Sequence, residues 1–424
     1  MRLSISSSII SRLMSFILGI WVFRFISINY SDNDISLWVI FSSIYAFIGF
    51  ADFGISNALI AKTSDLFIRA RRKDLSRYIS TAVVSLIFIS LICFVLYIII
   101  NMIFDIPKWL NIQKYENSSI LLNYILIVFL INIPLGFISR VQVGLQIGYL
   151  NSYYQILSNI LLILGIYLIT LNHSNFKDFV IIYYIFPNLV LLFNIFIFIN
   201  GPFGKLIKLS LKNFNLGDCK LIIGKGLCFF GIQLTAGLIS FVDPILINKG
   251  LDSSQVTLYG VTDKLFSVIT LSLGVFLAPL WAAYLHAKHN NDKAWIKKIF
   301  KQSLILSIFW TITIGLLIFV YNKEIIQLWL SKDIEITGNL VLAFIFLKLC
   351  ESVAMCFGAL YNGMDFIGFQ LKIAVLTCIF LLPIKVLMIE KYGVVGAILS
   401  TAFCMLFFAI LPSFVRLIRF LKSE

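Results

Sequence analysis

Charged side chains lie inside long hydrophobic stretches of this sequence, where charge is unusual. The cations are Arg12, Arg24, Lys225, Lys264, Lys348 and Lys385, and the acids are Asp52, Asp243, Asp263 and Glu351. One such charge at the centre of a bilayer costs about 2.5 to 3.5 kcal/mol on insertion scales. Most of these groups must therefore face a polar interior, pair with another charge or reach the membrane surface. Charges in such positions can hold an ionic substrate or take up and release a proton or Na⁺.

Asp52 is the acid that lies deepest by its position in the sequence. It stands ten residues before Lys62, which is about 15 Å along a helix and about half of a hydrocarbon core. Its side chain is too short to reach the headgroups, and Gly49 and Gly54 on either side allow a close neighbouring helix or a local break. Asp52 is therefore expected to be protonated, to pair with a cation on another helix, or to bind a coupling ion.

The other intramembrane charges leave more than one interpretation open. Lys348 and Glu351 are three residues apart on one helix face and can simply pair with each other. Arg24 and Asp243 lie about five residues, or about 7 Å, from a span end, so each can snorkel or face an interior.

Two further groups complete this set. Asp263 and Lys264 are adjacent and point in different directions, so at least one is expected to face another helix. The remaining cations lie close to span ends and are expected to snorkel: Arg12, Lys225 and Lys385.

The elements that must position these charges are membrane-spanning helices. Hydrophobic residues make up 60% of the 424 positions and charged residues only 13%, which is far from the composition of soluble domains. We predict an all-α multi-pass membrane protein of about twelve spans, at 9–29, 36–58, 79–104, 119–139, 151–171, 179–200, 223–247, 258–280, 302–321, 337–358, 371–389 and 393–415.

The distribution of Lys and Arg between the loops predicts the topology. The loops on the side of the N-terminus carry about three times as many of these residues as the loops on the other side, which places both termini in the cytoplasm. The net charge of +14 is explained in this way, so nucleic-acid binding is not expected. The run Arg69–Lys73 is interpreted as a topology anchor that can also contact anionic membrane lipid.

The two halves of the chain show a faint internal similarity. Arg24, Ile28 and Asn29 have the spacing of Asp243, Ile247 and Asn248. Repeats of this kind often form a transport site at their interface. The predicted division is an N-terminal six-helix lobe at 1–200, a cytoplasmic linker at 201–222 and a C-terminal six-helix lobe at 223–424.

Several catalytic classes are not favoured by the sequence. It has no GxxxxGK[ST] motif for nucleotide hydrolysis. The histidines lie in loops without a third ligand nearby, so no metal site or other bound cofactor is expected. A transporter is therefore expected rather than an enzyme.

Three stretches together resemble a known family. They are Ala51–Leu59 (ADFGISNAL), Gln142–Asn151 (QVGLQIGYLN) and Val242–Leu265, which contains Val242-Asp243 and Leu258-Tyr259-Gly260. The order of these motifs and the length of the chain are similar to those of the O-antigen flippases (Wzx type) of the polysaccharide transporter family. That family is part of the superfamily of multidrug, oligosaccharidyl-lipid and polysaccharide exporters.

The resemblance implies two six-helix lobes around a central cavity and an alternating-access mechanism. The implied cargo is an oligosaccharide on undecaprenyl pyrophosphate, moved from the cytoplasmic to the periplasmic leaflet of a bacterial inner membrane. A polysaccharide polymerase and chain-length proteins are the implied partners. Arg24, Lys264 and Lys348 could hold the negative charge of the pyrophosphate, and Arg24 is favoured because a guanidinium makes forked phosphate contacts.

Related transporters exchange their substrates for H⁺ or Na⁺, and the intramembrane acids could couple such an ion or pair helices: Asp52, Asp243, Asp263 and Glu351. The alternatives are a multidrug and toxin extrusion antiporter of the same superfamily, a flippase for the peptidoglycan precursor and a membrane glycosyl polymerase. The excess of intraspan cations over acids favours an anionic cargo over a cationic drug.

Overall fold

The fold is built from helices throughout the part of the chain that the structure describes. The structure is a computed structural model, and it describes residues 2–48, 54–171, 175–207, 209–210, 213–277, 279–330, 334–364 and 366–422. No strand occurs within these ranges. Asp52 lies outside the described residues, so its predicted roles stay predictions.

The chain forms two compact units, and each is described here by itself. Unit 1 consists of Met1–Phe25 and Phe41–Leu234, and unit 2 consists of Ile26–Ile40 and Thr235–Glu424. The boundaries of the units fall within helices rather than in loops. The predicted division at 1–200, 201–222 and 223–424 stays a prediction.

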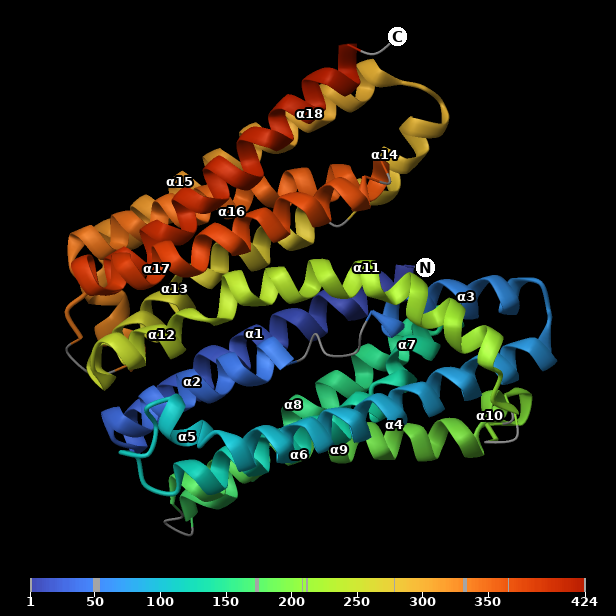
Figure 1. Cartoon of the computed structure of the whole chain (residues 1–424), viewed down its shortest axis with the longest axis horizontal. Coiled ribbons are helices and arrows are strands. Elements are labelled where there is room, and N and C mark those ends of the chain that lie inside the picture. The colour runs from blue at the N-terminus through green and yellow to red at the C-terminus, as the bar shows by residue number, and fades with distance from the viewer. Residues whose placement is uncertain are drawn as a thin grey trace. The chain divides into compact units, whose positions relative to one another are not determined.

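Unit 1 contains the helices of the first half of the chain (Figure 1). They are α1 (Arg2–Asn29), α2 (Asp32–Ile48), α3 (Ile55–Ile68), α4 (Arg72–Ile103), α5 (Ile106–Trp109), α6 (Ser118–Leu135), α7 (Phe137–Gly144), α8 (Gly148–Leu171), α9 (Phe176–Asn200), α10 (Pro202–Leu206) and the first part of α11 (Leu216–Phe241). The ends of α1 and α2 that face each other across their turn belong to unit 2.

Helices α4, α6 and α9 pack side by side in unit 1, and α3 packs on α7. The core that joins them is made of fully buried aliphatic side chains such as Leu59, Ile79 and Val141. Close approach of α3 to α7 requires Gly144, because a Cβ there would lie 2.7 Å from the Cβ of Thr63. A larger residue at this position would therefore push the two helices apart.

Unit 2 contains the remaining helices (Figure 1). They are the end of α11, α12 (Asp243–Gly250), α13 (Ser253–Leu277), α14 (Leu280–His289), α15 (Lys293–Leu330), α16 (Gly338–Met364), α17 (Ile367–Cys404), a π-helical turn at Met405–Ile410 and α18 (Leu411–Lys422). Helix α16 packs against α13, α14, α15 and α17, so it is the central helix of this unit.

Residues 26–40 join unit 2 through a short set of contacts with α13. The hydroxyl groups of Ser36 and Thr257 are 2.9 Å apart, and the Ser253 hydroxyl donates to the side-chain oxygen of Asn33 at 3.0 Å. Val39 fits against Gly260, where a Cβ would lie 2.5 Å from a Val39 methyl group. The turn between the first two helices is therefore packed on the second half of the chain.

The chain is a multi-pass membrane protein. Ten helical stretches in the described residues are long and apolar enough to cross a membrane. The predicted span 36–58 includes undescribed residues between α2 and α3, and the predicted spans 371–389 and 393–415 lie within one stretch, Ile367–Leu421. That stretch is interrupted at Gly393, whose φ of 61° suits a residue without a Cβ. The number twelve and the cytoplasmic position of the termini stay predictions.

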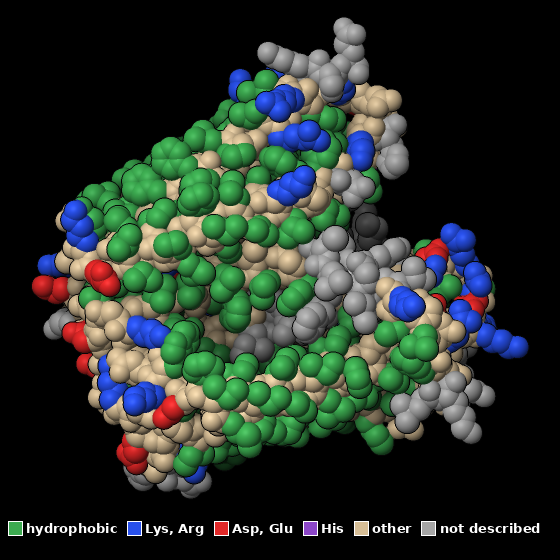
Figure 2. Space-filling view, in the orientation of Figure 1, with side chains coloured by type: hydrophobic (Ala, Val, Ile, Leu, Met, Phe, Trp, Pro, Cys, Tyr) green, Lys and Arg blue, Asp and Glu red, His purple; other side chains and the backbone are tan. Residues whose placement is uncertain are grey.

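The surfaces of the helices match this environment. Large hydrophobic side chains on α4 and α15, such as Phe88, Leu91 and Phe309, are exposed. Figure 2 shows hydrophobic side chains along the sides of the helices and charged side chains gathered near their ends. This arrangement suits helices whose sides contact lipid and whose ends lie at the headgroups.

Candidate functional site

A fully buried ion pair joins α12 to α17 in unit 2. Asp243 is the first residue of α12, directly after the break that ends α11, and Pro244 follows it at a position where a helix does not need its N–H. Its carboxylate accepts a hydrogen bond from the ammonium group of Lys385, and the two side chains are 3% and 0% exposed. Sequence analysis predicted that Lys385 would snorkel to the membrane surface. That prediction is wrong, because the lysine points inward to the carboxylate.

A second charged cluster joins α13 to α16. The ammonium of Lys348 lies 2.9 Å from Glu351 Oε2 on the same helix and 3.4 Å from Asp263 Oδ1 on α13. The lysine side chain is 6% exposed, whereas the side chains of Asp263 and Glu351 are 44% and 26% exposed. The intrahelical pairing that the spacing of Lys348 and Glu351 allowed is therefore present, and Asp263 extends it to a second helix.

Tyr259 lies between the two clusters. It precedes Asp263 by one helical turn on α13, and its phenol interacts with the carboxylate of Asp243. The charges of Asp263 and Glu351 also act on this phenol. Its ring lies 6.0 Å from that of Phe344, which precedes Lys348 by one turn of α16. The tyrosine thus connects the two clusters into one network of α12, α13, α16 and α17.

The groups that form the ion pairs are three carboxylates, of Asp243, Asp263 and Glu351, and two ammonium groups, of Lys348 and Lys385. The ammonium of Lys264 adjoins Asp263 on α13, and with it the positive and negative charges of the network are equal in number. Asp263 and Glu351 keep part of their surface exposed, so their oxygens could take up a proton or Na⁺.

Lys264 and Arg24 have different surroundings. Lys264 is half-buried and follows Asp263 on α13, where its positive charge adjoins the network. Arg24 is half-buried on α1 in unit 1. The structure therefore brings together five of the predicted site residues within unit 2: Asp243, Asp263, Lys264, Lys348 and Glu351.

Sequence reasoning missed two members of this network, Lys385 and Tyr259. Lys385 was predicted to reach the membrane surface because it lies close to a predicted span end. A buried carboxylate such as that of Asp243 requires a cation, and no neighbour on its own helix supplies one. Tyr259 lies in the motif Leu258-Tyr259-Gly260 but carries no charge, so the energetic cost of a charge in the membrane did not point to it. A search for a partner to every buried acid would have favoured Lys385.

The polar contacts between helices of unit 1 named here are neutral. The Asn132 amide on α6 donates to Asn188 on α9 at 2.9 Å. Gln142 on α7 and Asn194 on α9 exchange two hydrogen bonds of 2.6 and 3.3 Å while each is 1% exposed. These amide pairs bridge the same helices that form the hydrophobic packing of unit 1.

The fold of this chain occurs in solved membrane transporters. The chain superposes on a structure titled as the inward-facing conformation of a multidrug resistance MATE family transporter of the MOP superfamily, with a TM-score of 0.80, 11% identity and coverage of 98% of this chain and 96% of that one. For the outward-facing conformation of such a transporter the TM-score is 0.65, with 12% identity and coverage of 99% and 96%.

The same fold occurs in a flippase. The lipid II flippase MurJ, in an inward closed conformation, matches with a TM-score of 0.67 and 15% identity over 100% of this chain and 88% of that one. No family model and no curated protein sequence matches the chain. The fold is thus that of MATE transporters and MurJ.

Proposed function

We propose that the protein is an ion-coupled flippase for an oligosaccharide carried on undecaprenyl pyrophosphate. It would move this lipid from the cytoplasmic to the periplasmic leaflet of a bacterial inner membrane by alternating access. The fold supports the proposal, because structures that share it include a lipid II flippase and transporters. The resemblance of the three sequence motifs to O-antigen flippases supports the choice of cargo.

The observation that carries the proposal is the charged network of unit 2. Charges at membrane depth are costly and are usually kept for a function. The partly exposed carboxylates of Asp263 and Glu351 could exist with and without a bound cation. A transporter can exploit this property if the two access states differ in their affinity for that cation.

Arg24 is proposed to contact the pyrophosphate, because a guanidinium makes the forked contacts that a phosphate accepts. It is half-buried on α1 in unit 1. Lys264, half-buried on α13 in unit 2, is an independent candidate for the anionic part of the cargo. Lys348 contacts carboxylates, so it would act on the anion only when a carboxylate of its cluster has taken up the coupling ion.

The direct test is flipping by the purified protein. Proteoliposomes would carry a fluorescent oligosaccharide on undecaprenyl pyrophosphate, and quenching from outside would report its leaflet. We expect flipping that is accelerated by an imposed H⁺ or Na⁺ gradient and reduced in Arg24→Gln. Flipping at the rate of protein-free vesicles would refute the proposal. In cells, gene deletion should abolish O-antigen or another surface polysaccharide.

A multidrug antiporter is the second candidate, and a specific observation favours it. The partly exposed carboxylates of Asp263 and Glu351 suit a cationic cargo, as does the fold shared with MATE transporters. The phenotype of the deletion strain distinguishes the two candidate functions. Loss of drug resistance with normal surface polysaccharide in the deletion strain would favour the antiporter, and the converse would favour the flippase.

The proposed cellular context follows from the cargo. A polysaccharide polymerase and chain-length proteins would use the flipped repeat units in the periplasm, and a chemical reaction within this chain is not part of the proposal. Genes for glycosyltransferases and a polymerase beside this gene would be expected. Neighbouring genes for drug-responsive regulation alone would argue against the polysaccharide assignment.

A further inference from the structure

One end of unit 2 carries a concentration of basic side chains. The starts of α15 and α17, the end of α18 and helix α14 meet there (Figure 1). The Lys288 ammonium donates to the carbonyl of Met364 at 2.9 Å, which joins α14 to the end of α16. We name this end the unit 2 basic surface, and its described basic residues are Lys288, Lys293, Lys297, Lys298, Lys301, Lys372, Arg416 and Arg419.

Basic side chains outnumber acidic ones among the described residues of this surface. Within the described parts of 280–301, 366–375 and 411–421, the acid is Asp292, and its carboxylate accepts the backbone N–H of Trp295 at 2.9 Å. Most of the basic side chains are exposed. Figure 2 shows Lys and Arg along this end of the unit, next to hydrophobic side chains.

The guanidinium of Arg416 lies over two aromatic rings. Its guanidinium carbon lies 4.9 Å from the ring centre of Phe366 and 5.9 Å from that of Phe369. Stacking uses the face of the guanidinium and leaves N–H groups on its edge available for the forked contact that a phosphate accepts. Arg419 lies one turn further along the same helix, so the two arginines are neighbours.

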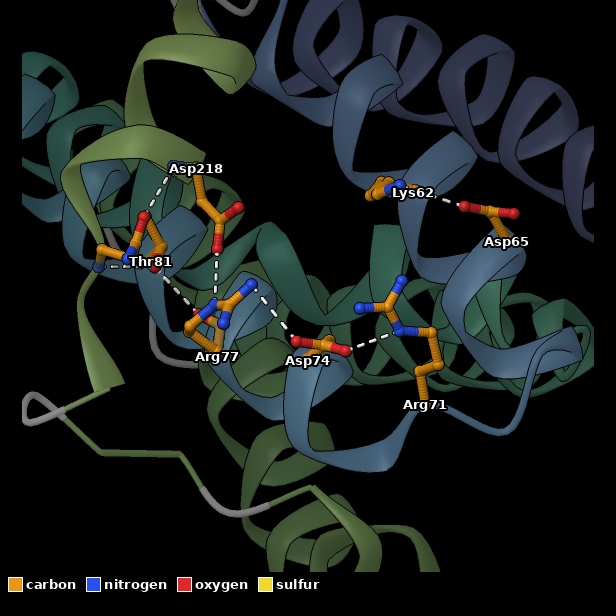
Figure 3. A network of polar contacts seen from close by, with 8 residues as sticks. Lys62, Asp65, Arg71, Asp74, Arg77, Thr81 and Asp218 are labelled. Carbon is orange, nitrogen blue, oxygen red and sulfur yellow. Dashed lines mark hydrogen bonds and ion pairs between the residues drawn. The ribbon is translucent and has the colours of Figure 1, made fainter.

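The turn between α3 and α4 in unit 1 carries acids among its basic residues. Figure 3 shows ion pairs of Lys62, Arg71 and Arg77 with acids near this turn. Asp65 pairs with Lys62 and Arg69 at 3.0 and 2.6 Å. Asp74 pairs with Arg71 at 2.6 Å, and Arg77 contacts both Asp74 and Asp218, at 3.2 and 2.9 Å. Arg72 and Lys73 in the same turn are exposed, so the acids offset part of the positive charge here.

We infer that the unit 2 basic surface binds the headgroups of anionic phospholipids, and that it does so more strongly than the α3–α4 turn of unit 1, where acids offset part of the positive charge. The exposed Val415 and Ile418 lie beside Arg416 and Arg419 on α18, so one helix presents apolar and basic groups together. Such a helix suits the boundary between acyl chains and phosphates. A soluble anion would gain nothing from the apolar part. This inference does not depend on the cargo that the protein transports.

Native mass spectrometry of the full-length protein tests the inference, with phosphatidylglycerol and phosphatidylcholine as probes. Each basic residue near an anionic bilayer contributes about 1 kcal/mol, or about 5-fold in affinity. The double variant Arg416→Gln/Arg419→Gln should therefore retain phosphatidylglycerol about 25-fold more weakly. Phosphatidylcholine binding should be unchanged.

The matched control removes the same charge from unit 1. Arg69→Gln/Arg71→Gln should keep phosphatidylglycerol binding within about 2-fold of the wild type, because those arginines contact acids. A second pair, Lys297→Gln/Lys298→Gln, changes exposed residues and guards against a folding defect at the stacked Arg416. It should also weaken binding of the anionic lipid.

Three results would overturn the inference. The first is equal loss of phosphatidylglycerol in the unit 1 control. The second is equal retention of phosphatidylcholine and phosphatidylglycerol by the wild type. The third is displacement of the lipid by millimolar inorganic phosphate, which would indicate a site for small anions in place of a lipid surface.

Discussion

The polar contacts that join helices inside unit 1 differ in kind from those that join helices inside unit 2. In unit 1, amides pair with amides, as Asn132 does with Asn188 and Gln142 with Asn194. In unit 2, carboxylates pair with ammonium groups across α12, α13, α16 and α17. Burying an amide pair between helices costs little desolvation free energy. Burying an ion pair costs much more, and the attraction between the two charges offsets only part of that cost.

The two kinds of contact differ in whether they respond to ions. Amides do not titrate, so the amide contacts of unit 1 do not depend on the proton or Na⁺ concentration. The carboxylates of the unit 2 network can gain or lose a cation, and two of them are partly exposed. The comparison therefore predicts that changes to these two sets of contacts will have different consequences.

The largest effect is expected from breaking the fully buried pair. Lys385→Met leaves Asp243 charged and unpaired in the interior, which should cost about 3–5 kcal/mol of stability. Thermal unfolding in detergent would measure it. The double variant Asp243→Leu/Lys385→Met should recover most of the loss, because both desolvation costs disappear together. A single variant as stable as the wild type would show that the pair does not hold α12 on α17.

The next effect concerns transport rather than stability. Asp263→Asn and Glu351→Gln remove charges that are partly exposed, so folding should change little. The response of flipping to an imposed H⁺ or Na⁺ gradient should fall by about 5- to 150-fold, the usual range of coupling between two sites. Proteoliposomes with and without the gradient would measure the response. A gradient response equal to that of the wild type in both variants would remove these acids from coupling.

A smaller effect is expected in unit 1. Asn132→Leu removes the hydrogen bond to Asn188 between α6 and α9, while the Asn188 amide keeps its bond to the carbonyl of Tyr184. The loss should be about 1 kcal/mol and the same at pH 6 and pH 8, because no titrating group takes part. Unfolding at the two pH values would test it. A strongly pH-dependent loss would contradict the contrast between the units.

The smallest effect is expected outside the membrane, at Asp65. The hydrogen bond from Lys62 lowers the pKa of this carboxyl, and the charge of Arg69 acts in the same direction. A lowered folded pKa stabilises the protein above the unfolded value of about 3.9, and the contribution disappears as the pH falls through the folded value. Asp65→Asn should therefore lower Tm slightly at pH 7. The gap between variant and wild type should close on acidification; a gap that widens would contradict this sign.

Much of the architecture could be predicted because hydrophobic length is a local property. Apolar stretches long enough to cross a bilayer identify a multi-pass helical protein without any tertiary information. The spacing of Lys348 and Glu351 likewise predicted a contact within one helix, and that contact is present. The stretch Ile367–Leu421 covers the two predicted spans 371–389 and 393–415, and it is interrupted at Gly393, where the second of these spans was predicted to begin.

The partners of the buried charges could not be predicted in the same way. Asp243 and Lys385 are separated by 142 positions, and Asp263 and Lys348 by 85. Position in a span says how far a charge lies from the membrane surface, but not which side of the helix faces a neighbour. This is why Lys385 was assigned to the surface although it lies in the interior.

The sequence alone determined that the chain is helical, that it lies in a membrane and that it carries charges at costly depths. Those properties follow from composition and from spacing along one helix. Only the tertiary structure decided which acid meets which lysine, and which basic residues are left without acids at the ends of the units. The reason is physical: the energy of a buried charge depends on a few ångströms to its partner, and helix packing sets that distance.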